Sequence, residues 1–524
     1  MFVASLDRTK TTPREAIHIV APALKAVGIN VDNLTLCTTS LYEARKKVRS
    51  VIEENVRETF NPNTPLIAHF DGKILPDHDG INSDRMPIVV SGKNIEKLLA
   101  IPKLSGSGTG VMMGSKVVEV LKQWEGVPEW LAGLCFDTTS ANTGLHNGAI
   151  NIVQQAFDKR LLFLACRHHI LEIIAAAVFD SFFCSSGPQI PIFVRFREQW
   201  SFIDQSKYDP IDRETEGYKL TEPEKMWLEQ NSAAVVDFLR DALTGDKQPR
   251  QDYREFIKLS LVAFGETEQF PGGVHFSPPG AYHRARWMAK GIYSLKMLCF
   301  RKQFKMNAHE LQALKRICLF TITIYVKVWI TAPISCDAPL NDLCLLQDME
   351  SFLAVDKDVA TVALKKMKGH LWYLSEDLVA LALFSDRVYT HEKMAIVAAF
   401  EKPERNGDLR RIDAKMIPLF QATTLSEFVT KRSLHLFTAL KLSRDFLSVD
   451  PATWDSREDY RQSKETVAVN DCAERAVKLA TDFDMALTHD EEQRQLIFQV
   501  VEHHRKLIPA PLKKSFATTE RTML

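Results

Sequence analysis

The sequence lacks several features that would place it directly in a class of proteins. Its longest apolar run, ICLFTITIYVKVWITAPI, is interrupted by Lys327. A membrane helix needs about 20 predominantly apolar residues, so we expect no membrane partner. The nine cysteines contain no Cys-x-x-Cys pair. This pattern argues against a zinc-finger array and favours reduced, buried thiols in an intracellular protein.

An excess of charge of one sign is also absent, because 66 Lys and Arg residues balance 66 Asp and Glu residues. A nucleic-acid surface would therefore have to be a local patch, since the net charge supplies no attraction. What the sequence does have is the composition of a globular protein, with 45% hydrophobic and 25% charged residues. Its 524 residues predict two or three structural units.

The spacing of apolar residues changes along the chain. Residues 1–60 show the three- and four-residue steps of helices, whereas 64–75, 85–92 and 95–104 are short apolar runs that predict a three-stranded meander. The next segments predict helix, strand, helix and strand, namely GVMMGSKVVEVLKQWEG, WLAGLCFD, HNGAINIVQQAFDK and LLFLAC. Alternating strands and helices imply a parallel portion of sheet. From His168 onward almost every periodic segment predicts a helix.

Two acids stand at the ends of predicted strands. Asp71 ends LIAHF on the first strand, and Asp137 ends LAGLCF on the fourth. If the first strand is central, these carboxylates converge and could hold a divalent metal against phosphate oxygens. Each acid alone is better explained by a cap or a turn, since Asp137 precedes the hydroxyl residues of TTS.

Three further short motifs follow Asp137 along the chain. They are CRHH with Cys166 and His169, ARW with Arg286 and Trp287, and NDCAERAVKLA with Glu474. Each motif is weak alone, but in this order, after Asp71 and Asp137, the sequence resembles the hAT superfamily of DNA transposases. The resemblance covers roughly residues 65–510 and is specific only at these motifs.

The resemblance implies an α/β plus all-α architecture, in which an RNase H-like mixed sheet flanked by helices is interrupted by a large helical insertion. The expected parts are an N-terminal helical segment, the first part of the core, the insertion, the C-terminal helices that complete the core, and a tail. These correspond to residues 1–60, 61–167, 168–460, 461–510 and 511–524.

The resemblance also implies a nuclear enzyme that cleaves DNA and transfers the cut strand. Asp71, Asp137 and Glu474 would hold two Mg²⁺ or Mn²⁺ ions. The residues expected to contact DNA are Arg284, Arg286, Trp287 and Lys290. The basic residues that follow, Lys296 and Arg301 among them, are either a solvated helix face or, because they cluster near Trp287, a track for the DNA backbone. Cys166 and His169 are expected to have a structural role, while Asn142 and His168 are candidates to support the metal ligands from behind.

The sequence departs from the family at both ends. Active members usually begin with a BED-type zinc domain, and no Cys/His array precedes Asp71. The chain is therefore a shortened product, a member of a divergent branch, or a former transposase retained as a non-catalytic DNA- or protein-binding factor. The segment DEEQRQLIFQVVEHHRKLIPAPLKKSF differs from the usual dimerisation ending, so the family's oligomeric state does not carry over and a homo-oligomer stays open. A nuclease without strand transfer is a third reading, against which the long helical insertion argues.

Overall fold

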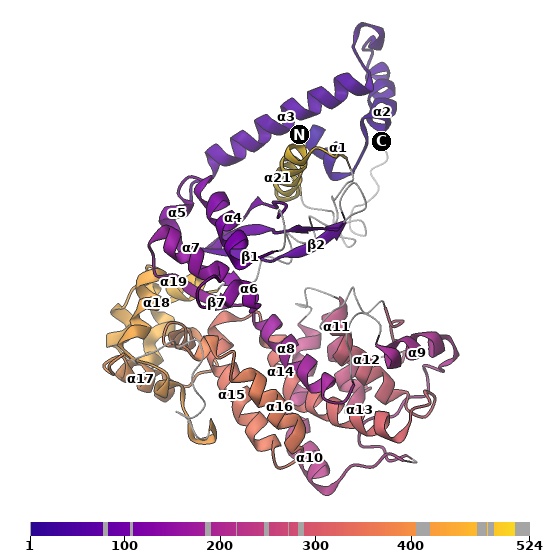
Figure 1. Ribbon diagram of the computed structural model, residues 1–524, viewed down its shortest axis with the longest axis vertical. Coiled ribbons are helices and arrows are strands. Elements are labelled where there is room, and N and C mark those ends of the chain that lie inside the picture. Colours follow the sequence, from indigo (N-terminus) through magenta and orange to yellow (C-terminus); the bar gives the residue numbers. More distant parts are fainter. Residues whose placement is uncertain are drawn as a thin grey trace. The chain divides into compact units, whose positions relative to one another are not determined.

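Figure 1 shows the chain as a computed structural model. The residues that the structure describes are 2–76, 82–104, 108–183, 190–215, 217–245, 251–270, 272–280, 288–404, 420–468, 479 and 487–508. The chain divides into two compact units. The first consists of Met1–Phe163 and Asp471–Leu524, and the second of Leu164–Asn470. The segment expected to be an insertion, 168–460, lies within the second unit.

The centre of the first unit is a five-stranded mixed sheet with the order β5-β4-β1-β6-β7. The strands in this order are Ile95–Ala100, Ile88–Gly92, Leu66–Phe70, Leu131–Phe136 and Leu162–Ala165. Strand β1 pairs antiparallel with β4 and parallel with β6. All residues of β1 and β6 are buried, which explains why their sequences are continuous apolar runs rather than alternating ones.

The predicted first run, 64–75, is not one strand. Strand β1 ends at Phe70, and a separate two-stranded ribbon follows, formed by β2 (Lys73–Pro76) and β3 (Asn82–Arg85). The prediction of only three strands before the first crossover helix was therefore wrong, because it did not include this ribbon. Strand β3 reads NSDR and carries no apolar alternation, so only its pairing with β2 defines it.

Two helices of the crossover connections pack on one another. Helix α4 (Gly110–Lys122) joins β5 to β6 through the short helix α5 (Val127–Trp130), and α7 (Ala149–Phe157) lies between β6 and β7. Gly114 makes the close approach possible, because a Cβ there would lie 2.8 Å from the Cβ of Ile152. The short helix α6 (Ser140–Thr143) contacts both α4 and α7.

Helix α21 (Glu491–Leu507) returns from the far end of the sequence to the sheet. Its Ile497 and Phe498 pack in one buried cluster with Val89 of β4 and Leu98 of β5. Leu479 belongs to the same cluster. The predicted C-terminal segment 461–510 is consequently divided, because α19 (Glu458–Thr466) belongs to the second unit and α21 to the first.

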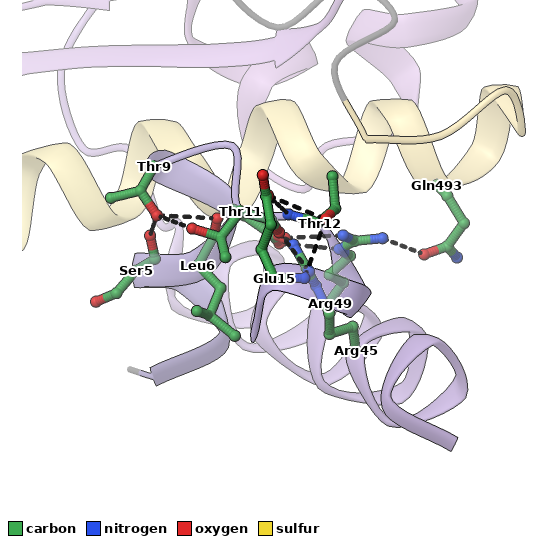
Figure 2. A network of polar contacts seen from close by, with 10 residues as sticks. Ser5, Leu6, Thr9, Thr11, Thr12, Glu15, Arg45, Arg49 and Gln493 are labelled. Carbon is green, nitrogen blue, oxygen red and sulfur yellow. Dashed lines mark hydrogen bonds and ion pairs between the residues drawn. The ribbon is translucent and has the colours of Figure 1, made fainter. Parts of the chain in front are cut away.

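The N-terminal helices are part of the first unit rather than a separate segment. Helices α1 (Phe2–Arg8) and α3 (Thr38–Thr59) contact α21, and α2 (Pro13–Ala26) contacts α3 (Figure 1). A polar network joins them, and its buried part centres on Asp7 (Figure 2). In it, Arg45 and Arg49 of α3 share the carboxylate of Asp7, and Arg49 also donates to Gln493 of α21 at 3.2 Å.

The second unit is helical, as the periodicity from His168 onward predicts. Its described α-helices are Arg167–Asp180 (α8), Pro191–Gln199 (α9), Glu222–Thr244 (α10), Gln251–Ala263 (α11), Met288–Cys299 (α12), Ala308–Phe320 (α13), Val326–Thr331 (α14), Ala338–Phe352 (α15), Lys357–Met367 (α16), Thr390–Ala399 (α17), His435–Ala439 (α18) and α19. The long apolar run lies in α13, a buried π-helical turn at Thr321–Tyr325, and α14. Among the described residues, no helix has the length and apolar character of a membrane span.

Candidate functional site

Asp71 and Asp137 follow two strands that are parallel neighbours. The register of β1 and β6 pairs Ala68 with Leu134 and His69 with Cys135. The rings of Phe70 and Phe136, one residue further, stack with their centroids 6.3 Å apart. Continuation of this register pairs Asp71 with Asp137. Since neighbouring strands lie about 4.8 Å apart, the two acids occupy adjacent positions at one edge of the sheet.

The carboxylate of Asp137 is held by one oxygen only. Its Oδ1 accepts hydrogen bonds from the backbone N–H of Thr139 at 3.1 Å, the Thr139 hydroxyl at 2.6 Å and the side-chain amide of Asn142 at 2.6 Å. No described residue donates to Oδ2. Asp137 can therefore be a turn-stabilising acid and a metal ligand at the same time, because Oδ1 stabilises the turn that follows the strand while Oδ2 is available to a ligand.

The turn that carries these donors is closely packed. A Cβ at Gly110, the first residue of α4, would lie 2.2 Å from the carbonyl oxygens of Ala141 and Asn147. Gly148 approaches the carbonyl oxygens of Asn142 and Gly144 in the same way. Asn142 itself is completely buried. The loop after β6 is thus supported by close backbone contacts, which fix the donors that hold Asp137.

The chemistry of the two acids fits a hard divalent cation, since carboxylate oxygens are the ligands that Mg²⁺ prefers. The described part of the chain contains no group of three or more His, Cys, Asp or Glu side chains arranged to bind a metal. The third predicted ligand, Glu474, lies outside the described residues. Leu479, five positions later, packs on the same sheet through Val89 and Leu98.

The CRHH motif begins α8, and its most constrained residue is one that the sequence prediction did not select. Arg167 is buried and donates to Oδ1 of Asp342 through Nε at 3.2 Å and Nη2 at 2.6 Å. Burial raises the pKa of Asp342, and Arg167 opposes that shift. Cys166 and His169 are half-buried. The only sequence signal for Arg167 was an arginine at the start of a strongly apolar helix.

His168 was expected to support the metal ligands, and the structure shows contacts of its ring with Trp329 and Tyr253. Its ring lies 4.3 Å from that of Trp329, and its Nε2 is 3.3 Å from the Trp329 carbonyl oxygen. Tyr253 contacts the same ring from another helix. Asn142, in contrast, contacts Asp137 directly.

Of the predicted DNA contacts, Arg284, Arg286 and Trp287 lie outside the described residues. Lys290 is buried, its ammonium group lies 2.8 Å from Oδ1 of Asp180, and it lies over the ring of Phe179. Lys290 was expected to contact DNA, but this ion pair places its charge within the packing of the second unit.

Two further cations of the expected basic track are also engaged internally. Lys296 pairs with Glu255 at 2.7 Å. Arg301 donates to the carbonyl oxygens of Asp209 and Pro210 at 2.9 and 2.7 Å. At these two positions the cluster of basic residues in the sequence corresponds to buried structural contacts.

Comparison of the sequence with models of known protein families and with curated proteins gives no match.

Proposed function

We propose that this chain is a metal-dependent enzyme of DNA strand cleavage and strand transfer, built on an RNase H-like core of the hAT transposase type. One observation carries the proposal: Asp71 and Asp137 follow adjacent parallel strands in the same register, at the same edge of the sheet. A sheet in which the first strand is central and the fourth lies parallel beside it is the arrangement that the resemblance requires.

Asp71 and Asp137 would hold two Mg²⁺ or Mn²⁺ ions, with Glu474 as the third ligand. When bound, such an ion pair activates the attacking water or 3′-hydroxyl and stabilises the leaving oxygen. The chain's own contribution is to position the carboxylates. Thr139 and Asn142 fix Asp137 through its Oδ1, and the loop packed on Gly110 keeps them in place. DNA contact remains assigned to Arg284, Arg286 and Trp287, without Lys290.

The direct test is nicking of supercoiled plasmid DNA with and without Mg²⁺. Metal catalysis contributes several kcal/mol, so Asp71→Asn and Asp137→Asn should each lower the rate by about 100-fold or more. A matched control is Asp32→Asn, because Asp32 is an exposed acid of the short helix between α2 and α3. Equal nicking by wild type and Asp137→Asn would overturn the proposal. Binding of DNA without nicking by the wild type would favour the non-catalytic alternative.

A further inference from the structure

The donors around Asp137 bear on which metal ion the site accepts, a question that rests on the proposed function. A carboxylate oxygen offers about two lone-pair positions. Oδ1 of Asp137 already accepts from three donors, two of them at 2.6 Å. This oxygen therefore has no lone pair left for a cation, and a metal would reach Asp137 through Oδ2 alone.

Asn142 cannot easily give up its hydrogen bond to Oδ1 of Asp137. Its side chain is completely buried, and its own Oδ1 has no hydrogen-bond partner. Rotation of the Asn142 amide by half a turn would direct its oxygen at the Asp137 carboxylate. It would also break the hydrogen bond between the Asn142 amide nitrogen and Asp137. The unsatisfied acceptor is therefore tolerated because the amide nitrogen bonds a charged oxygen, which is the stronger of the two interactions. The contact of the same nitrogen with the Asp137 carbonyl oxygen at 3.3 Å adds to this constraint.

Coordination by one oxygen distinguishes the biological divalent cations. Mg²⁺ requires near-octahedral geometry at about 2.1 Å, whereas Ca²⁺ accepts six to eight oxygens, often with a carboxylate bound through both of its oxygens. A carboxylate that binds through Oδ2 alone suits Mg²⁺, whereas Ca²⁺ cannot bind it through both oxygens. We infer that Thr139 and Asn142 are positioning residues that make the Asp137 site selective for Mg²⁺ over Ca²⁺.

The test is isothermal titration of the full chain with MgCl₂ and, separately, with CaCl₂. The binding heat lost in Asp137→Asn identifies the site. Thr139→Val removes the hydroxyl donor, and the exposed position of Thr139 makes this variant safe for folding. Loss of a supporting hydrogen bond should weaken Mg²⁺ binding by roughly tenfold or more. Ca²⁺ binding should be unchanged or tighter, because Oδ1 becomes available to it.

Three further variants complete the test. Asn142→Ala should shift the ratio of the two dissociation constants in the same direction, and Thr139→Ser, which keeps the hydroxyl, should restore it. Asn151→Ala is the matched control, since Asn151 donates to the carbonyl oxygens of Gly144 and Leu145 in the same loop. It should leave the ratio unchanged.

The inference is overturned if Thr139→Val weakens both ions equally or neither, or if Thr139→Ser behaves like Thr139→Val. These failures differ from that of the proposed function. If Asp137→Asn binds both ions as the wild type does, no metal binds at this carboxylate and the proposed function fails. If Asp137→Asn abolishes binding but Thr139→Val keeps the wild-type ratio, only the inference on selectivity fails.

Discussion

Arg49 holds Asp7 with both sides of its guanidinium group: Nε lies 2.9 Å from Oδ2 of the carboxylate and Nη2 lies 2.8 Å from Oδ1. Both side chains are buried, and Arg45 donates to the same carboxylate. Because Arg49 also donates to Gln493, one polar cluster joins α1, α3 and α21. Helices α1 and α3, near the start of the sequence, thereby share one core with α21.

Asp7→Asn should strongly destabilise the first unit. The substitution leaves two buried guanidinium groups without a balancing charge, and loss of one partner of a buried pair costs about 3–5 kcal/mol. The free energy of unfolding, measured by urea denaturation, should fall by that amount. Asp32→Asn should change it by less than about 0.5 kcal/mol. Equal effects of the two substitutions would contradict the importance of this cluster.

His504 of α21 should make the contact between α1 and α21 sensitive to acid. Its Nε2 lies 3.1 Å from the Ser5 hydroxyl, and its Nδ1 lies 3.4 Å from Nη1 of Arg8. Burial lowers the pKa of His504 below 6.5, and the charge of Arg8 lowers it further. The folded state therefore binds fewer protons than the unfolded state, and stability should be lost as the pH falls below 6.5.

The measurement for His504 is the free energy of unfolding at pH 7.5 and at pH 5.5. The wild type should lose more stability between these values than His504→Gln, which cannot be protonated. The neighbouring His503 also has a lowered pKa and is retained in both proteins as an internal control. An identical loss in both proteins would show that His504 does not contribute.

The exposed thiol of Cys37 should be the most reactive among the cysteines that the structure describes. Hydrogen bonds with Ser40 lower the pKa of Cys37, which caps the N-terminus of α3. Burial raises the pKa of Cys299 to about 12. Brief treatment of the native protein with iodoacetamide and peptide mapping should find Cys37 labelled first. Equally fast labelling of Cys299 would contradict the described burial.

Gly114→Ala should destabilise the first unit although alanine favours helices. A Cβ at this position would lie 2.8 Å from Ile152 Cβ and 2.9 Å from the Ala149 carbonyl oxygen. Overpacking of this kind costs about 1–3 kcal/mol. Gly245→Ala is a suitable control, because its nearest contact would be 3.5 Å and its φ is −65°. Urea denaturation should separate the two variants.

The sequence predicts the centre of the main sheet well because β1 and β6 are buried on both faces and therefore apolar. Strand β3 escapes prediction, since NSDR has no apolar residue and only its partner β2 defines it. Asp71 and Asp137 were predictable because each follows a buried apolar strand. The contact of Asn142 with Asp137 was predictable from its place in the turn after β6. The role of Thr139 was not, because a hydroxyl next to an aspartate has many uses.

Buried charges were the main source of error. A lysine or arginine in a helix is usually on the surface, so Lys290 and Arg301 were interpreted as DNA contacts. Their partners, Asp180 and the carbonyl oxygen of Asp209, are distant in sequence and cannot be found from periodicity. Arg167, which pairs with Asp342, was missed for the same reason.

The most direct test of the central claim is the location of Mn²⁺ in crystals grown or soaked with MnCl₂. Anomalous scattering should show a peak between the carboxylates of Asp71 and Asp137, about 2.1 Å from Oδ2 of Asp137, with Oδ1 still bonded to Thr139 and Asn142. An absence of Mn²⁺ at these carboxylates at saturating concentration, or a peak bound elsewhere only, would contradict the account.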